Sequence, residues 1–596
     1  MIAFGVVEVS VDRDRRSEAR EVESLIASAR CVAGASAFEP RWGSLSELLH
    51  ARASLTPDAP YLTFVDPDHG VERALSYREI EQRVAQAAAD LAQRGVASGH
   101  RVALLLGNLD YAIILYLAVW ALGACAVPLN SNESEQRKEL ILADSNVRLL
   151  VARVEWIDEA RRLAASRGIE LVAVEPHPQA TEVGAENDVY PRAWLAQAPV
   201  DRARSEHGSA PMWDHEALVV YTSGTTGSPK GVVLDQYNLM ASADALALWH
   251  GLDASTRMLC VLPIHHVNGL VVTHVTPLYV GGSTVLCARF SAARFWDDVA
   301  RHGASLVSLV PTLLEFLLEA SRTDTSKVAA GLPPGAVRVL CGAGPLAVET
   351  ALAFESRFAM PLIHGYGLSE STAYNCQIPV EISDAERRSW LSEHGFPSLG
   401  CPLPHHEMAI LGPDGRRVGE GERGEIAVRG AVISRGYLGR PDVNRTTFAS
   451  GWLHTGDEGF TKQDSQGRQH FFISGRIKEL IIRGGVNYSP LEIDEVLRAH
   501  PAVLHGLAIP FSNRWYGEEI AAYVVPRAGA APSEDELLAH CRARLDFARC
   551  PKCIVFGTEI PYTTTGKARR LELARKLGQE LSRFRETQFR APRDTR

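Results

Sequence analysis

The sequence ALVVYTSGTTGSPKG at residues 217–231 determines how the rest of the chain is interpreted. It begins as an apolar run typical of a buried strand and ends in a Ser, Thr and Gly loop that is closed by Lys230. Glycines let backbone N–H groups approach phosphate oxygens, hydroxyl side chains add donors, and the lysine adds positive charge. We therefore predict a phosphate-binding loop. It is not a Walker A loop, because the only Gly-Lys dipeptide, at residues 566–567, continues with Ala568.

Apolar runs alternate with longer amphipathic segments on either side of this loop. Strand-like runs such as RVALLLG at 101–107 alternate with helix-like segments such as SYREIEQRVAQAAADLAQRG at 76–95. This alternation predicts an α/β fold with parallel-rich sheets. After Cys401, short strands separated by Gly-rich turns predict an antiparallel, barrel-like subdomain, and the residues beyond it predict a small α+β C-terminal domain.

These changes in pattern divide the chain into four parts: an extension at 1–43, a large domain at 44–477, a small domain at 478–580 and a basic tail at 581–596. The extension mixes charged and small residues with little apolar periodicity, so we expect it to be poorly ordered and assign it no function. The tail ends in RFRETQFRAPRDTR, with five Arg against two acidic residues. We expect it to be solvated.

The composition is that of a globular protein. Of the 596 residues, 46% are hydrophobic and 22% are charged, which excludes collagen-like, coiled-coil and wholly disordered chains. The formal net charge of −9 provides no overall electrostatic footprint for nucleic acid, so no nucleic-acid partner is expected. Ten cysteines without a repeating pattern favour a reducing compartment, and the N-terminus lacks a secretory signal pattern. We therefore expect a cytoplasmic protein.

One uncharged stretch, residues 112–129, reaches the length of a membrane span. Gly123 and Pro128 interrupt it, and the polar sequence NSNES follows it. The pattern therefore favours a buried helix that runs into a short core strand, without stable membrane insertion.

Four further segments carry chemistry in a fixed order. They are HGYGLSES at 364–371, WLHTGDEG at 452–459, ISGRIKELIIRGGVNYSP at 473–490 and PYTTTGKARR at 561–570. Together with the loop at 217–231, they resemble the motifs of the AMP-forming adenylating enzymes: acyl-CoA synthetases, aryl-CoA ligases, peptide-synthetase adenylation domains and luciferases. The resemblance covers residues 44–577. It departs from the usual motif at Ser369, where threonine is common, although serine keeps the hydroxyl.

The resemblance implies a set of nucleotide-binding residues. Tyr366 would lie against adenine, Asp457 would accept hydrogen bonds from the ribose, and Arg476 would contact ribose or phosphate. Lys478 would be the hinge about which a mobile C-terminal domain rotates. The full set of expected nucleotide-binding residues is Thr222, Ser223, Gly224, Thr226, Gly227, Lys230, Gly342, Tyr366, Gly367, Ser369, Asp457, Arg476 and Lys478.

The resemblance also implies catalytic residues and an acyl pocket. Glu370 and Thr225 are the expected Mg²⁺ ligands, and Lys567 is the expected catalytic lysine. The expected catalytic residues are Lys567, Glu370, Thr225 and His266, and the expected substrate pocket consists of Val267, Asn268, Ala343, Gly344, His364 and Gly365. Gly484 and Gly485 begin a loop that would lie beside the thiol channel.

The implied reaction has two steps. The carboxylate of a small-molecule acid attacks the α-phosphorus of ATP and pyrophosphate leaves, after which a nucleophile displaces AMP. No carrier domain follows in this sequence, so coenzyme A is the first expectation for the acceptor. Transfer to a separate carrier protein or an amine is second, and activation of an unusual acid such as nitrite for arylamine diazotisation is a minority alternative. A catalytically silent nucleotide-binding protein is disfavoured, because Glu370, Asp457, Arg476 and Lys567 are all present.

Overall fold

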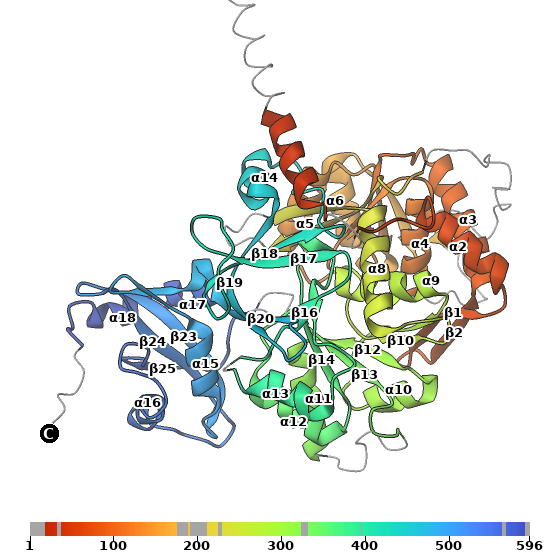
Figure 1. Ribbon diagram of the computed structural model, residues 1–596. Coiled ribbons are helices and arrows are strands. Elements are labelled where there is room, and N and C mark those ends of the chain that lie inside the picture. The colour runs from red at the N-terminus through yellow and green to blue at the C-terminus, as the bar shows by residue number, and fades with distance from the viewer. Residues whose placement is uncertain are drawn as a thin grey trace, which may run out of the picture.

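The structure is a computed structural model that describes residues 18–32, 37–175, 189–190, 211–223, 229–323, 332–394, 396–562 and 568–589. Within these residues the strands pair into four sheets. Figure 1 shows the first three sheets packed together and the fourth standing to one side with the last helices. The α/β architecture with a smaller C-terminal domain that the sequence predicted is confirmed.

The first sheet contains the strand that leads into the predicted phosphate-binding loop. Its order is β7-β6-β5-β3-β4-β8-β9, and neighbouring strands are parallel except in the β8–β9 hairpin. The strands are β3 (Arg101–Leu105), β4 (Cys125–Pro128), β5 (Leu149–Arg153), β6 (Glu170–Val174), β7 (Val189–Tyr190), β8 (Glu216–Ser223) and β9 (Pro229–Asp235). Thr222 lies opposite Lys230 in the hairpin, so the two ends of the loop sequence are neighbours.

The second sheet has the order β16-β15-β14-β13-β12-β10-β11-β1-β2 and is parallel except at its two ends. Its strands are β1 (Pro60–Asp66), β2 (Val71–Ser76), β10 (Arg257–Cys260), β11 (Ser283–Cys287), β12 (Leu306–Leu309), β13 (Arg338–Cys341), β14 (Leu362–Tyr366), β15 (Cys376–Gln377) and β16 (Cys401–Pro402). The interior of these strands is almost continuously apolar and buried, as expected for parallel strands covered on both faces.

Helices pack around these two sheets and between them (Figure 1). Several begin with side-chain caps, such as Ser76 at α3 and Asp235 at α8, which satisfy the first free backbone N–H groups. The helices of this large domain are α2 (Leu45–Leu55), α3 (Tyr77–Gln93), α4 (Asp110–Ala121), α5 (Glu135–Ser145), α6 (Ile157–Arg167), α8 (Gln236–His250), α9 (Thr276–Val280), α10 (Phe295–His302), α11 (Pro311–Thr323), α12 (Val348–Phe358) and α13 (Asp384–Ser392).

The uncharged stretch at 112–129 is a buried helix followed by a core strand, as the sequence predicted. Every residue of α4 is buried, the chain turns at Gly123, and β4 follows in the first sheet. Among the helices of the described residues, none is long and apolar enough to cross a membrane.

The third sheet is antiparallel throughout, which confirms the change of pattern after Cys401. It has the order β17-β18-β19-β20, with β17 (His406–Leu411), β18 (Gly424–Gly430), β19 (Leu453–Gln463) and β20 (Gln469–Arg476). The short helix α14 (Pro441–Thr447) lies between β18 and β19 in the sequence. Figure 1 shows this sheet between the large domain and the C-terminal strands, so it can form a wall of any cavity at their junction.

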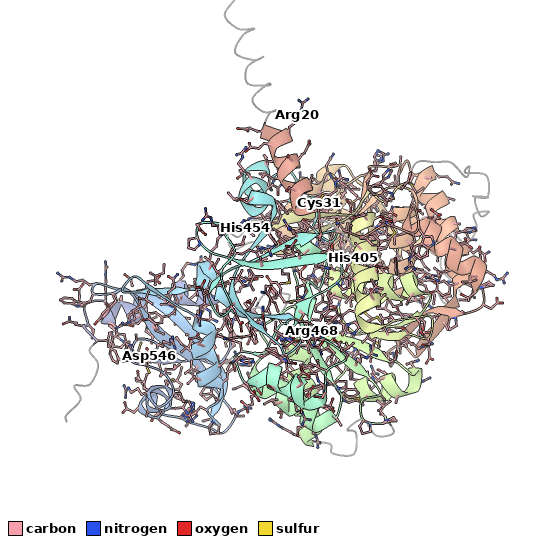
Figure 2. All side chains as sticks on the ribbon, viewed as in Figure 1. Arg20, Cys31, His405, His454, Arg468 and Asp546 are labelled. Atoms are coloured by element: carbon pink, nitrogen blue, oxygen red, sulfur yellow. The ribbon has the colours of Figure 1, made fainter. Side chains whose placement is uncertain are left out.

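The described part of the N-terminal extension is folded, in contrast to the poor order that we expected. Residues 18–29 are helical, and Val22, Ile26 and Ala29 are buried against the apolar core of the third sheet. Arg30 then forms a 2.6 Å ion pair with Asp235 at the start of α8. The helix lies beside α14 in Figure 1, and Arg20 marks it in Figure 2. We missed it because its buried residues, spaced four and three apart, are separated by charged and small residues.

The C-terminal domain has its own apolar cores around the fourth sheet. That sheet has the order β22-β21-β24-β23, and β25 pairs with β24. Its elements are β21 (Ile481–Arg483), β22 (Val486–Tyr488), α15 (Pro490–Arg498), β23 (Val503–Asn513), β24 (Gly517–Pro526), α16 (Glu534–Arg542), β25 (Ile554–Phe556), α17 (Arg570–Lys576) and α18 (Gly578–Leu581).

The described part of the predicted basic tail is packed, in contrast to the solvated tail we expected. The Leu581 side chain is buried, and the Asn513 amide donates hydrogen bonds to the carbonyl oxygens of Phe584 and Thr587. The Trp515 indole donates to the Glu586 carbonyl oxygen. Two phenylalanines in a charged segment supply the apolar contacts that the count of arginines obscured.

Candidate functional site

A cavity of about 720 Å³ lies where the large domain, the third sheet and the start of the C-terminal domain meet. Its wall includes Thr222 and Lys230 from the β8–β9 hairpin and Glu370 from the loop after β14. The charged residues of the wall are Arg137, Lys230, Arg476, Lys478, Glu133, Glu370, Glu425, Asp442 and Glu479. Anionic and cationic groups can therefore be bound in the same cavity.

Glu370 is held by a tyrosine that comes from a distant part of the chain. The Tyr437 hydroxyl donates a 2.7 Å hydrogen bond to Glu370 Oε1, and Lys230 Nζ lies 5.4 Å from the Tyr437 ring centroid. Burial and the neighbouring Glu370 carboxylate raise the pKa of Tyr437, so the phenol remains a donor. A carboxylate held in one orientation beside an ammonium group suits a hard cation bound to phosphate. The residues present therefore fit Mg²⁺.

A second cation faces the end of the β8 strand. Arg137 in α5 lines the cavity, forms a 3.1 Å ion pair with Glu133, and approaches the Thr222 carbonyl oxygen with Nη2 at 3.5 Å. With Lys230 across the hairpin, it places two positive charges beside the predicted phosphate loop. Their position favours a polyanion at this end of the cavity.

Asp457 lies immediately behind the wall in a fixed polar cluster. It is fully buried, accepts a 2.6 Å hydrogen bond from the Tyr366 hydroxyl, and forms a 3.0 Å ion pair with Arg476. The Asp457 charge raises the pKa of Arg476 more than burial lowers it. Arg476 itself lines the cavity, so it can contact a ligand while its own partner stays behind the wall.

Glu425 and His454 form another held pair on the third sheet. His454 Nδ1 lies 2.8 Å from Glu425 Oε2, and the Gly456 backbone N–H donates to Glu425 Oε1 at 2.8 Å. The hydrogen bond with Glu425 raises the pKa of His454 against the effect of burial. Both residues line the cavity, and Figure 2 labels His454 near the C-terminal side of this sheet.

The expected acyl end of the cavity is polar but carries no formal charge among its described residues. His265 and His266 have ring centroids 4.2 Å apart, and Asn268 accepts a 2.7 Å hydrogen bond from Ser308. Asn268 also begins a π-helix, Asn268–Val275, which is a rare element that often marks functional sites. Ala343 has a φ of 68°, a conformation that L-residues rarely adopt.

The cavity brings together about half of the residues that the sequence predicted for the site. Those on its wall are Thr222, Lys230, His266, Val267, Asn268, Ala343, Gly367, Ser369, Glu370, Arg476 and Lys478. Among the described residues that lie outside the wall are Gly342, Gly344, His364, Gly365, Tyr366 and Asp457. Gly224, Thr225, Thr226, Gly227 and Lys567, together with the side chain of Ser223, lie outside the described part of the chain.

His364 is held away from the cavity by its own partner. It is 3% exposed, and its Nδ1 lies 2.7 Å from the Ser398 carbonyl oxygen. Burial lowers the pKa of His364 to about 4. The side chain is thus a neutral core histidine, and its predicted contact with the acyl group has no support from its position.

Both ends of the segment that carries Lys567 are fixed. Tyr562 pairs with Ala568 in an antiparallel bridge. Arg570 is almost fully buried and forms a 2.6 Å ion pair with Asp494 and a 3.5 Å ion pair with Glu479. Because Glu479 lines the cavity, the end of this segment is connected to the cavity wall beside Lys478, the expected hinge residue.

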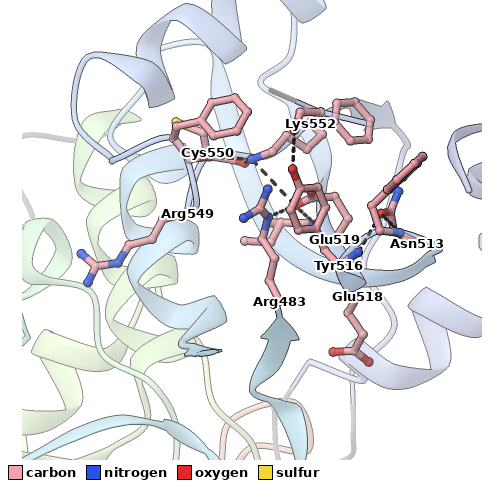
Figure 3. Close-up of polar contacts among 12 residues, drawn as sticks. Arg483, Asn513, Tyr516, Glu518, Glu519, Arg549, Cys550 and Lys552 are labelled. Atoms are coloured by element: carbon pink, nitrogen blue, oxygen red, sulfur yellow. Dashed lines mark hydrogen bonds and ion pairs between the residues drawn. The ribbon is translucent and has the colours of Figure 1, made fainter. Parts of the chain in front are cut away.

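The loop at Gly484 and Gly485 rests on a polar cluster of the C-terminal domain (Figure 3). Both glycines have positive φ, 59° and 82°, which other residues adopt only with strain. The Arg483 guanidinium lies 3.9 Å from the Tyr516 ring centroid and forms a 2.7 Å ion pair with buried Glu519. The Gly484 N–H donates to the Tyr516 carbonyl oxygen, so Tyr516 supports the loop twice.

Sequence reasoning missed several wall residues, above all Tyr437, Tyr374, Glu425 and His454. Tyr437 lies in the segment RGYLGRP at 435–441, which reads as an ordinary turn because a tyrosine between glycines suggests no chemistry. The Val233–Gly436 and Gly231–Leu438 backbone hydrogen bonds, which tie this turn to the β9 strand, connect residues two hundred positions apart. Only the folded structure shows that the turn at Tyr437 lies beside the β9 strand.

The fold and the cavity define a class of protein. One cavity is lined by the β8–β9 hairpin, which suits phosphate, by the oriented carboxylate of Glu370 and by the polar segment at 265–268. The C-terminal domain, which has its own apolar core, borders this cavity. This is the arrangement of an enzyme that joins a nucleotide to a second, smaller substrate.

Comparison with known proteins gives the family. Residues 49–438 match the AMP-binding enzyme family and residues 492–567 match the AMP-binding enzyme C-terminal domain. The sulfoacetate–CoA ligase of Cupriavidus necator is 36% identical over 89% of this chain and 97% of its own length. The oxalate–CoA ligase of Arabidopsis thaliana is 33% identical over 88% and 97%. The chain belongs to the AMP-binding enzyme family and is an AMP-forming acid ligase.

Two solved structures are similar to this chain over most of its length. ATP-bound MatB from Rhodopseudomonas palustris is 25% identical, with a TM-score of 0.75 over 90% of this chain and 99% of that one. The o-succinylbenzoate CoA synthetase from Bacillus subtilis, in complex with ATP and a magnesium ion, is 27% identical, with a TM-score of 0.73 over 88% and 98%.

Proposed function

We propose that this protein activates a carboxylic acid with ATP to form an acyl-adenylate and transfers the acyl group to coenzyme A. The observation that carries the proposal is the hydrogen bond from Tyr437 to Glu370 beside Lys230, on the same cavity wall as the uncharged polar segment at residues 265–268. One end of the cavity suits a metal-bound triphosphate, and the other suits a small organic acid. The two reactants would meet between them.

The residues of the chain divide the work of the first step. Lys230 and Arg137 would bind the phosphates, and Arg476 would contact the ribose or α-phosphate with Asp457 behind it. Glu370 would hold Mg²⁺, which supplies charge neutralisation on the triphosphate when bound. As pyrophosphate departs, these preformed charges stabilise the negative charge that develops on the phosphates. Lys567 would add a further positive charge in this step only.

Coenzyme A is our first choice of acceptor for two reasons. The two relatives described above, which match 89% and 88% of this chain, are both CoA ligases. In addition, Gly484 and Gly485 present a loop without side chains, which a pantetheine arm could approach closely. A carrier protein presents the same arm, so it remains the alternative acceptor, and an amine is the second.

Two assays test the proposal. Exchange of labelled pyrophosphate into ATP, measured over a panel of aliphatic, aromatic and dianionic acids and nitrite, should require one acid and Mg²⁺. With that acid, added coenzyme A should release AMP catalytically and yield a thioester detectable by mass spectrometry. Exchange without thioester formation would overturn the CoA assignment and leave adenylation standing. Absence of exchange with every acid would overturn adenylation.

A further inference from the structure

The carboxylate of Asp144 joins three segments at the phosphate end of the cavity. Asp144 lies in the last turn of α5, outside the cavity wall, and its side chain is 18% exposed. The Tyr221 hydroxyl of β8 donates a 2.7 Å hydrogen bond to Asp144 Oδ2. Arg440 Nη2 donates a 2.7 Å hydrogen bond to Asp144 Oδ1. Each carboxylate oxygen therefore binds a segment that is distant from α5 in the sequence.

The α5 helix places Asp144 and Arg137 along the same side of the hairpin. The two residues are seven positions apart, which is two helical turns, so they lie on one face of the helix. Arg137 lines the cavity and approaches the Thr222 carbonyl oxygen, while Asp144 binds the hydroxyl of the preceding residue, Tyr221. A shift of α5 along the hairpin would therefore move Arg137 relative to the phosphates that we assign to it.

The Tyr221 phenol is a fixed point for Asp144. Tyr221 lies opposite Gly231 in the hairpin, and a Cβ atom added to Gly231 would lie 2.9 Å from Tyr221 Cζ. Glycine therefore lets the ring lie across the hairpin. Burial and the Asp144 carboxylate raise the pKa of Tyr221, against the opposing effects of Ser145 and Arg101, so the phenol remains a donor.

Arg440 connects Asp144 to the turn at 435–441. Backbone hydrogen bonds between β9 and this turn fix the turn on the hairpin, and its Tyr437 orients Glu370. The α5 helix packs on the hairpin through an apolar core that it shares with β8 and β9. Burial of apolar surface is non-directional, whereas hydrogen bonds are directional, so the contacts of Asp144 determine where α5 lies along the hairpin.

We propose that Asp144 is a positioning residue for the β- and γ-phosphates of ATP, because it holds α5 in the place from which Arg137 binds the same triphosphate as Glu370 and its Mg²⁺. This inference rests on the proposed adenylation function and adds to it a residue that touches no reactant. Binding groups act best when supporting contacts already hold them in the geometry that the ligand requires. Arg440 balances the charge of Asp144, so the pair places no net negative charge beside the phosphates.

Nucleotide binding tests the proposal without knowledge of the acid. AMP lacks the β- and γ-phosphates, whereas α,β-methylene-ATP carries both and cannot release pyrophosphate. In calorimetry with Mg²⁺, Asp144→Asn should bind α,β-methylene-ATP about 10-fold more weakly than the parent protein does, and AMP within about twofold of it. A purely electrostatic effect would have the opposite sign, because the substitution removes a negative charge near the triphosphate. In pyrophosphate exchange, the KM for ATP should rise by the same factor while the KM for the acid stays unchanged.

Two further variants assign the effect to the named contacts. Tyr221→Phe keeps the ring and the net charge and removes one hydrogen bond of Asp144, so it tests the proposal even where Asp144→Asn does not fold. It should weaken binding of α,β-methylene-ATP more than binding of AMP. Arg137→Gln should weaken binding of α,β-methylene-ATP by itself. If Asp144 acts through Arg137, adding Asp144→Asn to that variant should cost less than about a further twofold.

Asp244→Asn is the matched control. Asp244 accepts a 2.7 Å hydrogen bond from the Tyr279 hydroxyl, and its other oxygen lies 2.7 Å from His405 Nε2, but these residues lie outside the cavity wall. Its substitution should lower thermal stability and leave the ratio of the two nucleotide affinities unchanged.

Three results would overturn the inference while adenylation stands. Asp144→Asn and Tyr221→Phe could fold and bind α,β-methylene-ATP as tightly as the parent protein, they could weaken both nucleotides equally, or the losses from Asp144→Asn and Arg137→Gln could add in full. A parent protein that binds neither nucleotide would overturn adenylation and this inference together.

Discussion

Three carboxylates at the cavity, those of Glu370, Glu425 and Asp457, are each held in one orientation by their own donors. Glu370 is held by Tyr437, Glu425 by His454 and the Gly456 N–H, and Asp457 by Tyr366 and Arg476. A carboxylate that is already oriented does not have to reorganise when charge develops on its ligand. The donors that orient these acidic side chains are therefore as important to the site as the acidic side chains themselves.

Tyr437→Phe tests this preparation at the expected metal site. The phenyl ring keeps its place over Lys230, but the hydrogen bond to Glu370 is lost. Because hydrogen bonds to charged groups contribute about 1.5 to 3 kcal/mol, we expect kcat for pyrophosphate exchange to fall about 10-fold to 100-fold and the Mg²⁺ requirement to rise. Mg²⁺ titrations of the exchange rate measure both effects.

Tyr279→Phe is the control, because Tyr279 also donates a 2.7 Å hydrogen bond to a carboxylate, Asp244, but lies outside the cavity wall. If Tyr437→Phe and Tyr279→Phe change the Mg²⁺ dependence equally, orientation of Glu370 by Tyr437 is not the cause.

Lys552 provides a prediction on pH. It is 4% exposed, lies 3.8 Å from Glu519 and donates to the carbonyl oxygens of Phe547 and Cys550, and burial lowers its pKa from 10.5 to about 8 (Figure 3). Between those two values the unfolded chain holds a proton that the folded chain has released. The contribution of this group to stability therefore rises with pH across the window, by at most about 3 kcal/mol.

Denaturant unfolding of the parent protein and of Lys552→Met at pH 7.5, 9 and 10.5 measures this contribution. We expect the unfolding free energy of the parent to increase relative to that of Lys552→Met as pH rises. A constant difference would show that Lys552 titrates in the folded chain as in the unfolded one, and a difference that moves toward Lys552→Met would show that its pKa is raised; either result would contradict the prediction.

Short elements, rather than long ones, connect the site to the rest of the fold. The helix at residues 18–29 packs on the turn that carries Tyr437: Ile26 Cδ1 would lie 2.9 Å from a Cβ added at Gly436, and the Asn444 side chain borders the same glycine. Asn444 accepts the backbone N–H of Tyr437 at 2.8 Å. The N-terminal helix is therefore a support for the cavity wall, although it touches no expected ligand.

Ile26→Ala tests that support. Truncation of a largely buried isoleucine should lower the unfolding free energy by about 2 kcal/mol, because the cavity that it leaves cannot collapse fully. The loss of exchange activity, expressed as a free energy, should be smaller than the loss of unfolding free energy, since the helix acts on the site only through the turn at Tyr437. Glu23→Ala, an exposed change on the same helix, should affect neither quantity. If the two variants unfold at the same temperature, the helix does not contribute to the stability of the core.

The loop at Gly484 depends on Tyr516 in a similar way. The Tyr516 ring stacks on Arg483, and its hydroxyl donates a 2.8 Å hydrogen bond to the Phe589 carbonyl oxygen, so the C-terminal segment and the loop share one anchor. Tyr516→Ala should therefore slow thioester formation from a supplied acyl-adenylate about 10-fold and leave pyrophosphate exchange nearly unchanged. Trp515→Ala, which changes the exposed neighbour at the same turn, is the control. Similar rates of thioester formation in the two variants would argue against the anchor.

The sequence alone predicted the elements whose cause is local and missed those whose cause is a distant contact. Apolar runs predicted the parallel strands, and an uncharged run broken at Gly123 predicted buried α4 followed by β4. The helix at 18–29 was missed because the surfaces that bury Val22 and Ile26 come from residues four hundred positions away. Tyr374 was missed for the same reason, since a tyrosine after a threonine and an alanine carries no signal until Gly342 is placed beneath its ring.

The whole molecule consists of bodies that have separate cores and share a polar boundary. Among the described residues, the apolar clusters of the C-terminal domain contain only residues from 481 onward. Leu491 of this domain packs, partly buried, against the apolar core of the second sheet. Arg423 and Glu492 cross the boundary as a 2.6 Å ion pair whose Arg423 side chain is 40% exposed. Exposed ion pairs stabilise by about 0 to 1 kcal/mol, so this pair adds little to the cost of separating the two bodies.

If the C-terminal domain moves between the two steps, the segment that carries Lys567 would face the cavity in the first step and the loop at Gly484 would face it in the second. Lys567→Ala tests this movement. We expect the variant to lose about 10²-fold to 10³-fold in pyrophosphate exchange, the usual cost of removing one stabilising group from a developing charge. Thioester formation from supplied acyl-adenylate should stay within about threefold, because the lysine would have left the cavity by then. Tyr516→Ala should show the opposite pattern from the other end of the same domain. Equal losses in both half-reactions for either variant would mean that the domain keeps one position throughout.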